Sequence, residues 1–122
     1  MNIALWVVTA LLAVAFLGAG LMKVSRTRPQ LVASGMGYAD DFTDGGVKGI
    51  GALEVLGALG LILPAVLDTA TILVPLAALG LALVMGGAVV VHVRRKEPFV
   101  PPLALGVLAL LVAILRFTTY AF

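Results

Sequence analysis

Four long apolar stretches divide this sequence and limit what the chain can fold into. They cover residues 3–22, 47–64, 69–92 and 100–118. A helix that crosses the hydrocarbon core of a membrane needs about 20 mainly apolar residues. Because backbone amides in lipid must be satisfied internally, helices are the spanning form for segments of this length. The sequence therefore predicts an all-α transmembrane four-helix bundle that forms a single domain over residues 1–122.

Composition agrees with a membrane protein and excludes several classes of site. Hydrophobic residues make up 62% of the chain and charged residues 11%, a balance that ordinary soluble domains do not have. The net charge of +2 is carried by a few basic residues in two short clusters, so we expect no nucleic-acid partner. With no cysteine and one histidine, the chain offers neither disulfides nor a structural zinc site.

The positions of the basic residues predict the orientation of the bundle across the membrane. One cluster follows the first span and the other follows the third, whereas the turn "PAVLD" between spans two and three has no basic residue. The positive-inside rule places both basic loops in the cytoplasm and both chain termini outside. The first span lacks a basic leader and a convincing A-x-A cleavage site before Lys23, so we expect it to be retained.

The loop between spans one and two is the only long connection, and it contains "RPQLVASGMGYADDFTDGG". Pro29 is suited to open a short helix with Leu31, Val32 and Met36 on its apolar side. Loops of this length are often lids or binding loops. The alternative is a surface helix that rests among the lipid headgroups.

The segment "DDFTD", from Asp40 to Asp44, matches the DDxxD pattern by which some prenyl-chain enzymes hold Mg²⁺ and a diphosphate. The surrounding chain lacks the large helical enzyme that such a motif needs, so we expect no metal site. We expect instead that Asp44, which precedes Gly45, caps the second span.

Glu54 is the one carboxylate inside the second span. Its neighbours on a helix are Ile50, Gly51, Gly57 and Ala58, three of which are small. Small residues mark the face on which membrane helices approach each other, so Glu54 is expected to point into the bundle. A charged carboxylate there costs at least a few kcal/mol unless it is paired.

The predicted topology limits the partners of Glu54. Lys23 ends the first span and His92 ends the third, both on the cytoplasmic side where Glu54 lies. Arg116 is about 24 Å along the fourth span from Val100, close to the outer face. Lys48 lies about 120° around the helix from Glu54. Lys23 and His92 are therefore the best candidates.

Two interpretations of this cluster remain open. Glu54, Lys23 and His92 either form a buried clamp that fixes the register of the helices, or line a pocket that binds the polar head of a lipid-like ligand or passes a proton. If the protein is an enzyme, Glu54 is the expected catalytic acid or base.

Small residues recur at four-residue spacing on two spans: Ala15 and Ala19 on the first, and Ala78, Ala82 and Gly86 on the third. Such ladders allow close helix packing. They serve either the contacts within one bundle or a homodimer face, and the sequence does not separate the two.

The end of the first span, "FLGAGLMK", the second-span run "GIGALEVLGALGLILP" and the end of the third span, "GGAVVVHVRR", resemble the DoxX-like family of small bacterial four-helix membrane proteins. The sharpest element is Lys23 together with a G-x-x-E-x-x-G-x-x-G-L pattern. That pattern is matched by Gly51, Glu54, Gly57, Gly60 and Leu61.

This resemblance implies a multi-pass protein of the bacterial inner (plasma) membrane near quinone or redox chemistry. Relatives include a subunit of a thiosulfate:quinone oxidoreductase and a member proposed to join a membrane oxidoreductase complex with a superoxide dismutase and a sulfurtransferase. The sequence itself has no Cys, no His pair for haem and no dinucleotide fingerprint. A redox role would therefore use a bound quinone or a cofactor of a partner protein.

The leading hypothesis is a non-enzymatic membrane subunit or binding protein that holds a quinone- or lipid-like molecule near Glu54, Lys23 and His92. One alternative is a small membrane enzyme in which Glu54, with His92, acts on an apolar substrate such as an isoprenoid. The other is a purely structural assembly subunit.

Overall fold

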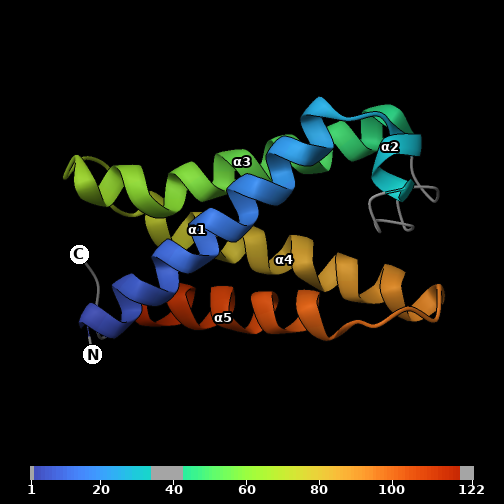
Figure 1. The fold of residues 1–122 in the computed structure, drawn as a ribbon. Coiled ribbons are helices and arrows are strands. Elements are labelled where there is room, and N and C mark those ends of the chain that lie inside the picture. Colours follow the sequence, from blue (N-terminus) through green and yellow to red (C-terminus); the bar gives the residue numbers. More distant parts are fainter. Residues whose placement is uncertain (1, 34–42, 119–122) are drawn as a thin grey trace.

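The computed structural model describes residues 2–33 and 43–118, and within these ranges the chain forms helices and no strands. The helices are α1 (Asn2–Ser25), α2 (Arg28–Ala33), α3 (Asp44–Val66), α4 (Leu73–Arg94) and α5 (Val100–Phe117) (Figure 1). All except α2 are long and apolar enough to cross a membrane. This confirms the predicted all-α bundle with four membrane-spanning helices.

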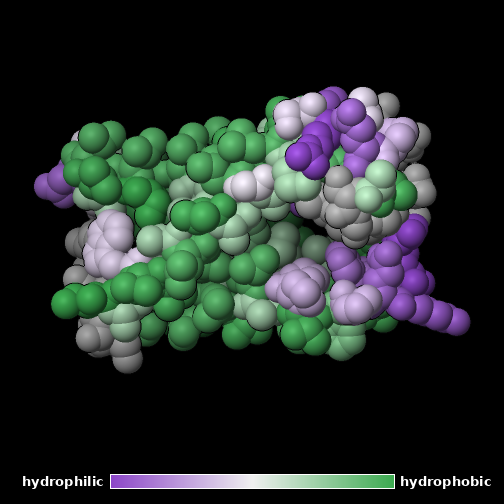
Figure 2. Space-filling model, viewed as in Figure 1, coloured by the Kyte–Doolittle hydropathy of each residue, from purple (hydrophilic) through white to green (hydrophobic). Residues whose placement is uncertain are grey.

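Each long helix packs against two others. α1 packs on α3, α3 on α4, α4 on α5, and α5 returns to α1 (Figure 1). Leu12, Phe16, Leu61, Leu81 and Val112 are among the buried side chains of the common core. Much of the outer surface is also apolar, as expected where helices face lipid (Figure 2). We call the end of the bundle that carries Arg26, Lys48 and Arg94 the basic end.

The connection between α3 and α4 differs from the sequence prediction. α3 continues through Pro64 to Val66, and α4 begins at Leu73 rather than Thr69. Pro64 has no N–H to donate, but its carbonyl still accepts a bond from the amide of Thr69 (3.0 Å). Asp68 and Ala70 have φ angles of 50°, which ends the helix and turns the chain.

The predicted short helix in the long loop is confirmed as α2. Thr27 and Gln30 cap its start reciprocally: the Gln30 amide donates to the Thr27 hydroxyl (3.4 Å), and the Thr27 amide donates to the Gln30 side chain (3.0 Å). Leu31 is fully buried and packs with Val47, which anchors α2 to the start of α3. Met36 lies outside the described residues.

The N-terminus of α3 is capped by Thr43, whose hydroxyl accepts from the amide of Gly46 at 2.9 Å. The prediction that Asp44 is the cap was wrong by one residue, because Asp44 is already the first helical residue and the hydroxyl before it does the capping. The other acidic residues of "DDFTD" lie outside the described residues.

α1 and α3 are in close contact where two glycines, Gly20 and Gly51, meet near the basic end. A Cβ atom built on Gly51 would lie 2.8 Å from the backbone oxygen of Gly20 and 2.7 Å from the Cβ of Lys23. Lys48 then holds the end of α1 by donating from Nζ to the carbonyl of Val24 at 2.8 Å. The two helices can touch here because neither glycine has a side chain.

The substitution Gly51→Ala is expected to push α1 away from α3 and to lower the free energy of unfolding by about 1–3 kcal/mol, as overpacking does. Gly18→Ala is the matched control, because a Cβ at Gly18 meets nothing within 4 Å. Reversible unfolding of both variants in mixed detergent checks this. Equal stability of the two variants would contradict the close approach.

Candidate functional site

Glu54 and Lys23 form a buried ion pair between α3 and α1. The side chain of Glu54 is 1% exposed and that of Lys23 is 7% exposed, and Lys23 donates from Nζ to Oε1 of Glu54 at 2.5 Å. The predicted inward orientation of Glu54 is therefore confirmed, and Lys23, one of its two predicted candidate partners, forms the ion pair. The pairing removes an otherwise large cost of placing either charge inside a membrane bundle.

The depth of this pair follows from an offset between the two helices. α3 begins at Asp44, so Glu54 lies about 15 Å along its axis at 1.5 Å per residue. Lys23 is in the last turn of α1, and that turn is level with Glu54.

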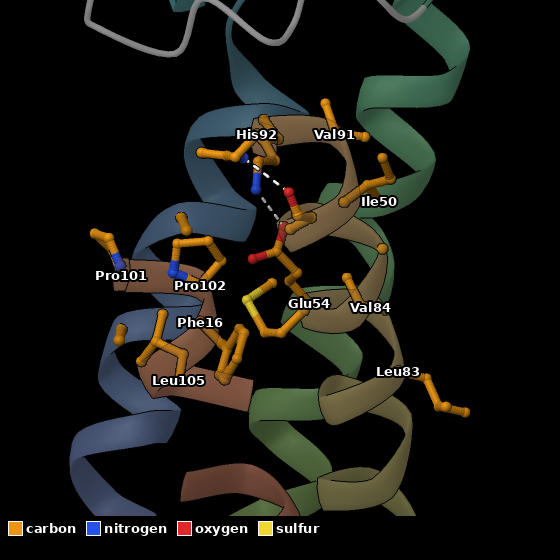
Figure 3. Close-up of a pocket in the computed structure, with 16 residues that line it drawn as sticks. Phe16, Ile50, Glu54, Leu83, Val84, Val91, His92, Pro101, Pro102 and Leu105 are labelled. Atoms are coloured by element: carbon orange, nitrogen blue, oxygen red, sulfur yellow. Dashed lines mark hydrogen bonds and ion pairs between the residues drawn. The ribbon is translucent and has the colours of Figure 1, made fainter. Parts of the chain in front are cut away.

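His92 comes from the last turn of α4 and lies close to the pair in Figure 3. Its Nδ1 donates to the carbonyl of Ala88, one turn back on the same helix, at 2.8 Å. A carbonyl can only accept, so this bond places a proton on Nδ1 and fixes the orientation of the ring. His92 is half-buried and lines the same cavity as Glu54 and Lys23.

Arg116 lies at the opposite end of the bundle, where α1 begins and α5 ends. Its side chain is buried, and its guanidinium carbon is 5.6 Å from the centre of the Trp6 ring. This cation–π contact ties the last turn of α5 to the first turns of α1. The prediction that Arg116 is too far along its helix to reach Glu54 agrees with this position.

A cavity of about 510 Å³ lies beside the ion pair and is walled by all four long helices. Its polar side chains lie near one another: Figure 3 shows His92 beside Glu54, and Lys23 is bonded to Glu54. The walls away from these side chains are apolar. They include Phe16 from α1, Met85 and Val84 from α4, and Pro102 and Leu105 from α5.

The small residues of α1 line the cavity, whereas their spacing predicts that they pack against another helix. Ala15 and Ala19 line this cavity, and Ala15 is exposed. On α4, Ala78 is fully buried in the core, whereas a Cβ at Gly86 would meet nothing within 4 Å. The regular spacing thus serves core contacts at Ala78 and Ala82 and leaves space at Gly86, Ala15 and Ala19.

The apolar walls were not identified from the sequence. Phe16, Met85 and Leu105 sit in spans where almost every residue is apolar, so their types carry no signal of a cavity. The polar end was identified because a charge inside a membrane helix is costly and therefore conspicuous.

Four membrane-length helices around a buried lysine–glutamate pair define a small multi-pass membrane protein. The sequence model of the DoxX-like family matches residues 7–114, so the chain belongs to the DoxX-like family. No curated protein and no solved structure matches it.

The ion pair should be strongly coupled in stability. Lys23→Met or Glu54→Leu alone leaves one buried charge without its partner and is expected to cost about 3–5 kcal/mol of unfolding free energy. The double variant replaces both charges by apolar groups and should lose less than either single variant. Unfolding free energies of the three variants check this. Additive losses would contradict a direct interaction.

Proposed function

We propose that this protein is a non-enzymatic membrane subunit or binding protein whose bundle holds a quinone- or lipid-like molecule. The observation that carries the proposal is the 510 Å³ cavity, which has apolar walls and one polar end at Lys23, Glu54 and His92. Binding sites for small molecules are commonly apolar cavities of about 300–1,000 Å³ with a few polar groups that fix orientation. An amphiphilic molecule has the same division between tail and head.

The space beside the ion pair favours binding over a purely structural clamp. A clamp between two helices needs only the paired side chains and gains from tight packing around them. Here both charged side chains also form part of the cavity wall. A ligand head placed in the cavity would therefore meet the ammonium and the carboxylate directly.

The pairing of Glu54 supports a holding role over catalysis. Its carboxylate accepts a bond from the Lys23 ammonium inside the bundle. The ion pair gives this carboxylate a structural role, because it joins α3 to the last turn of α1.

Family membership and charge distribution extend the proposal to location and partners. The purple hydrophilic groups in Figure 2 gather mainly at the basic end. By the positive-inside rule this end faces the cytoplasm and both termini face outward, in the plasma membrane of a bacterium. A reporter fused to the C-terminus tests this orientation. The resemblance that implied redox chemistry suggests membrane oxidoreductases as partner proteins.

Native mass spectrometry of the purified full-length protein should show a co-purified quinone or lipid. Glu54→Gln preserves size and removes the charge, so it should lower ligand occupancy at least about tenfold while the protein stays folded. Leu11→Ala, on the exposed face of α1, is the control. A folded bundle with nothing bound would reject the proposal. Full ligand occupancy in Glu54→Gln, together with unfolding of Glu54→Leu, would also reject it, because that result identifies the ion pair as a structural clamp.

A further inference from the structure

The charges in the cavity wall balance each other. Among the described residues that line the cavity, Lys23 and Glu54 are the ones with a fixed charge, and they are bonded to each other. The wall therefore offers a strong donor and a strong acceptor with no net charge. This combination restricts the kind of head group that the cavity can take.

We propose that the occupant is an amphiphile with an electrically neutral carbonyl or hydroxyl head, and that it enters sideways from the bilayer between α1 and α5. This inference rests on the proposed function, because it names the class of molecule that the same cavity binds.

A neutral head is favoured because a charged one would always meet a like charge. An anionic head beside Lys23 also lies beside the carboxylate of Glu54, and a cationic head beside Glu54 also lies beside the ammonium. Repulsion of this kind is strong where water is scarce. A carbonyl oxygen can accept from Lys23, and a hydroxyl can also donate to Glu54, without adding a charge to the interior.

The path from the bilayer follows from the way α1 and α5 separate. The two helices meet at the end where Arg116 lies over Trp6, and they move apart toward the basic end (Figure 1). Figure 2 shows the surface hollowed between them on that side. An opening between two spans faces lipid, so the molecules that reach it are those dissolved in the membrane.

Residues of α1 and α5 form the two sides of this opening. Ala15 and Ala19 contribute the α1 side, and Pro101 and Leu105 contribute the α5 side. Ala15 lies twelve residues from Ile3, at the middle of its span, so the opening reaches the hydrocarbon region. An occupant can then keep its tail in lipid while its head lies at the ion pair.

Photolabelling of the full-length protein in phosphatidylcholine nanodiscs tests both parts of the proposal. The probes are a long-chain alcohol and the corresponding long-chain carboxylate, each with the same diazirine in its tail. Labelling of Met85 and Leu105 is divided by that of lipid-facing Leu11, which corrects for partition into the bilayer. We expect this ratio to be at least about tenfold higher for the alcohol, which corresponds to about 1.4 kcal/mol.

Ala15→Phe should fill the opening and lower the ratio for the alcohol at least about fivefold, whereas Ala10→Phe should leave it unchanged. Ala10 is exposed on the same helix and does not line the cavity. Ala19→Leu is the second variant at the opening. Circular dichroism and a monodisperse elution profile confirm that each variant is folded.

The outcomes separate the inference from the function on which it rests. Equal ratios for the alcohol and the carboxylate overturn the neutral head. Unchanged labelling in folded Ala15→Phe and Ala19→Leu overturns access between α1 and α5. Absence of cavity labelling by both probes, with Leu11 labelled normally, overturns the proposed binding function itself.

Discussion

Lys23 and Glu54 can meet inside the bundle because two glycines remove the side chains that would keep their helices apart. Gly20 and Gly51 bring the backbones of α1 and α3 into contact, and Lys23 then reaches Glu54 from the last turn of α1. Each charge is tolerated at this depth because the other is present. Lys48 bonds the end of α1 to α3 and fixes the same crossing from outside. The sequence of small residues thus determines where a polar group can be buried in an otherwise apolar chain.

The same crossing leaves space elsewhere. With α1 held against α3 at the basic end and tied to α5 at the opposite end by Arg116 and Trp6, α1 runs diagonally across the bundle (Figure 1). The divergence of α1 from α5 leaves the cavity beside the ion pair. The helix contact and the cavity therefore have one origin, and a change in the α1–α3 contact should affect both. This supports a protein that holds a membrane-soluble molecule in a fixed orientation.

Much of this arrangement could be predicted from the sequence. The physical reasons for that also explain why other features could not be predicted. Span length, the burial of Glu54 and the choice of Lys23 and His92 as its candidate partners follow from hydrocarbon thickness and from the cost of a charge in lipid. The course of α3 past Pro64 could not be predicted, because proline near a helix end is compatible with either outcome. The apolar walls of the cavity could not be predicted either, since Ala15 and Ala19 have the spacing of a packed interface. Ala15 and Ala19 stay uncovered because of the angle at which the helices cross, and that angle is set by all four helices together.

The most direct test of a cavity that binds a neutral amphiphile against the ion pair is ¹³C-methyl NMR of the methionines. Met85 lines the cavity, whereas Met22 packs near Leu31 and is not part of the wall. Titration of a long-chain alcohol into the full-length protein in nanodiscs should shift the Met85 methyl resonance saturably and leave that of Met22 in place. A Met85 resonance that stays unmoved, or that drifts with Met22 without saturation, would contradict the binding function.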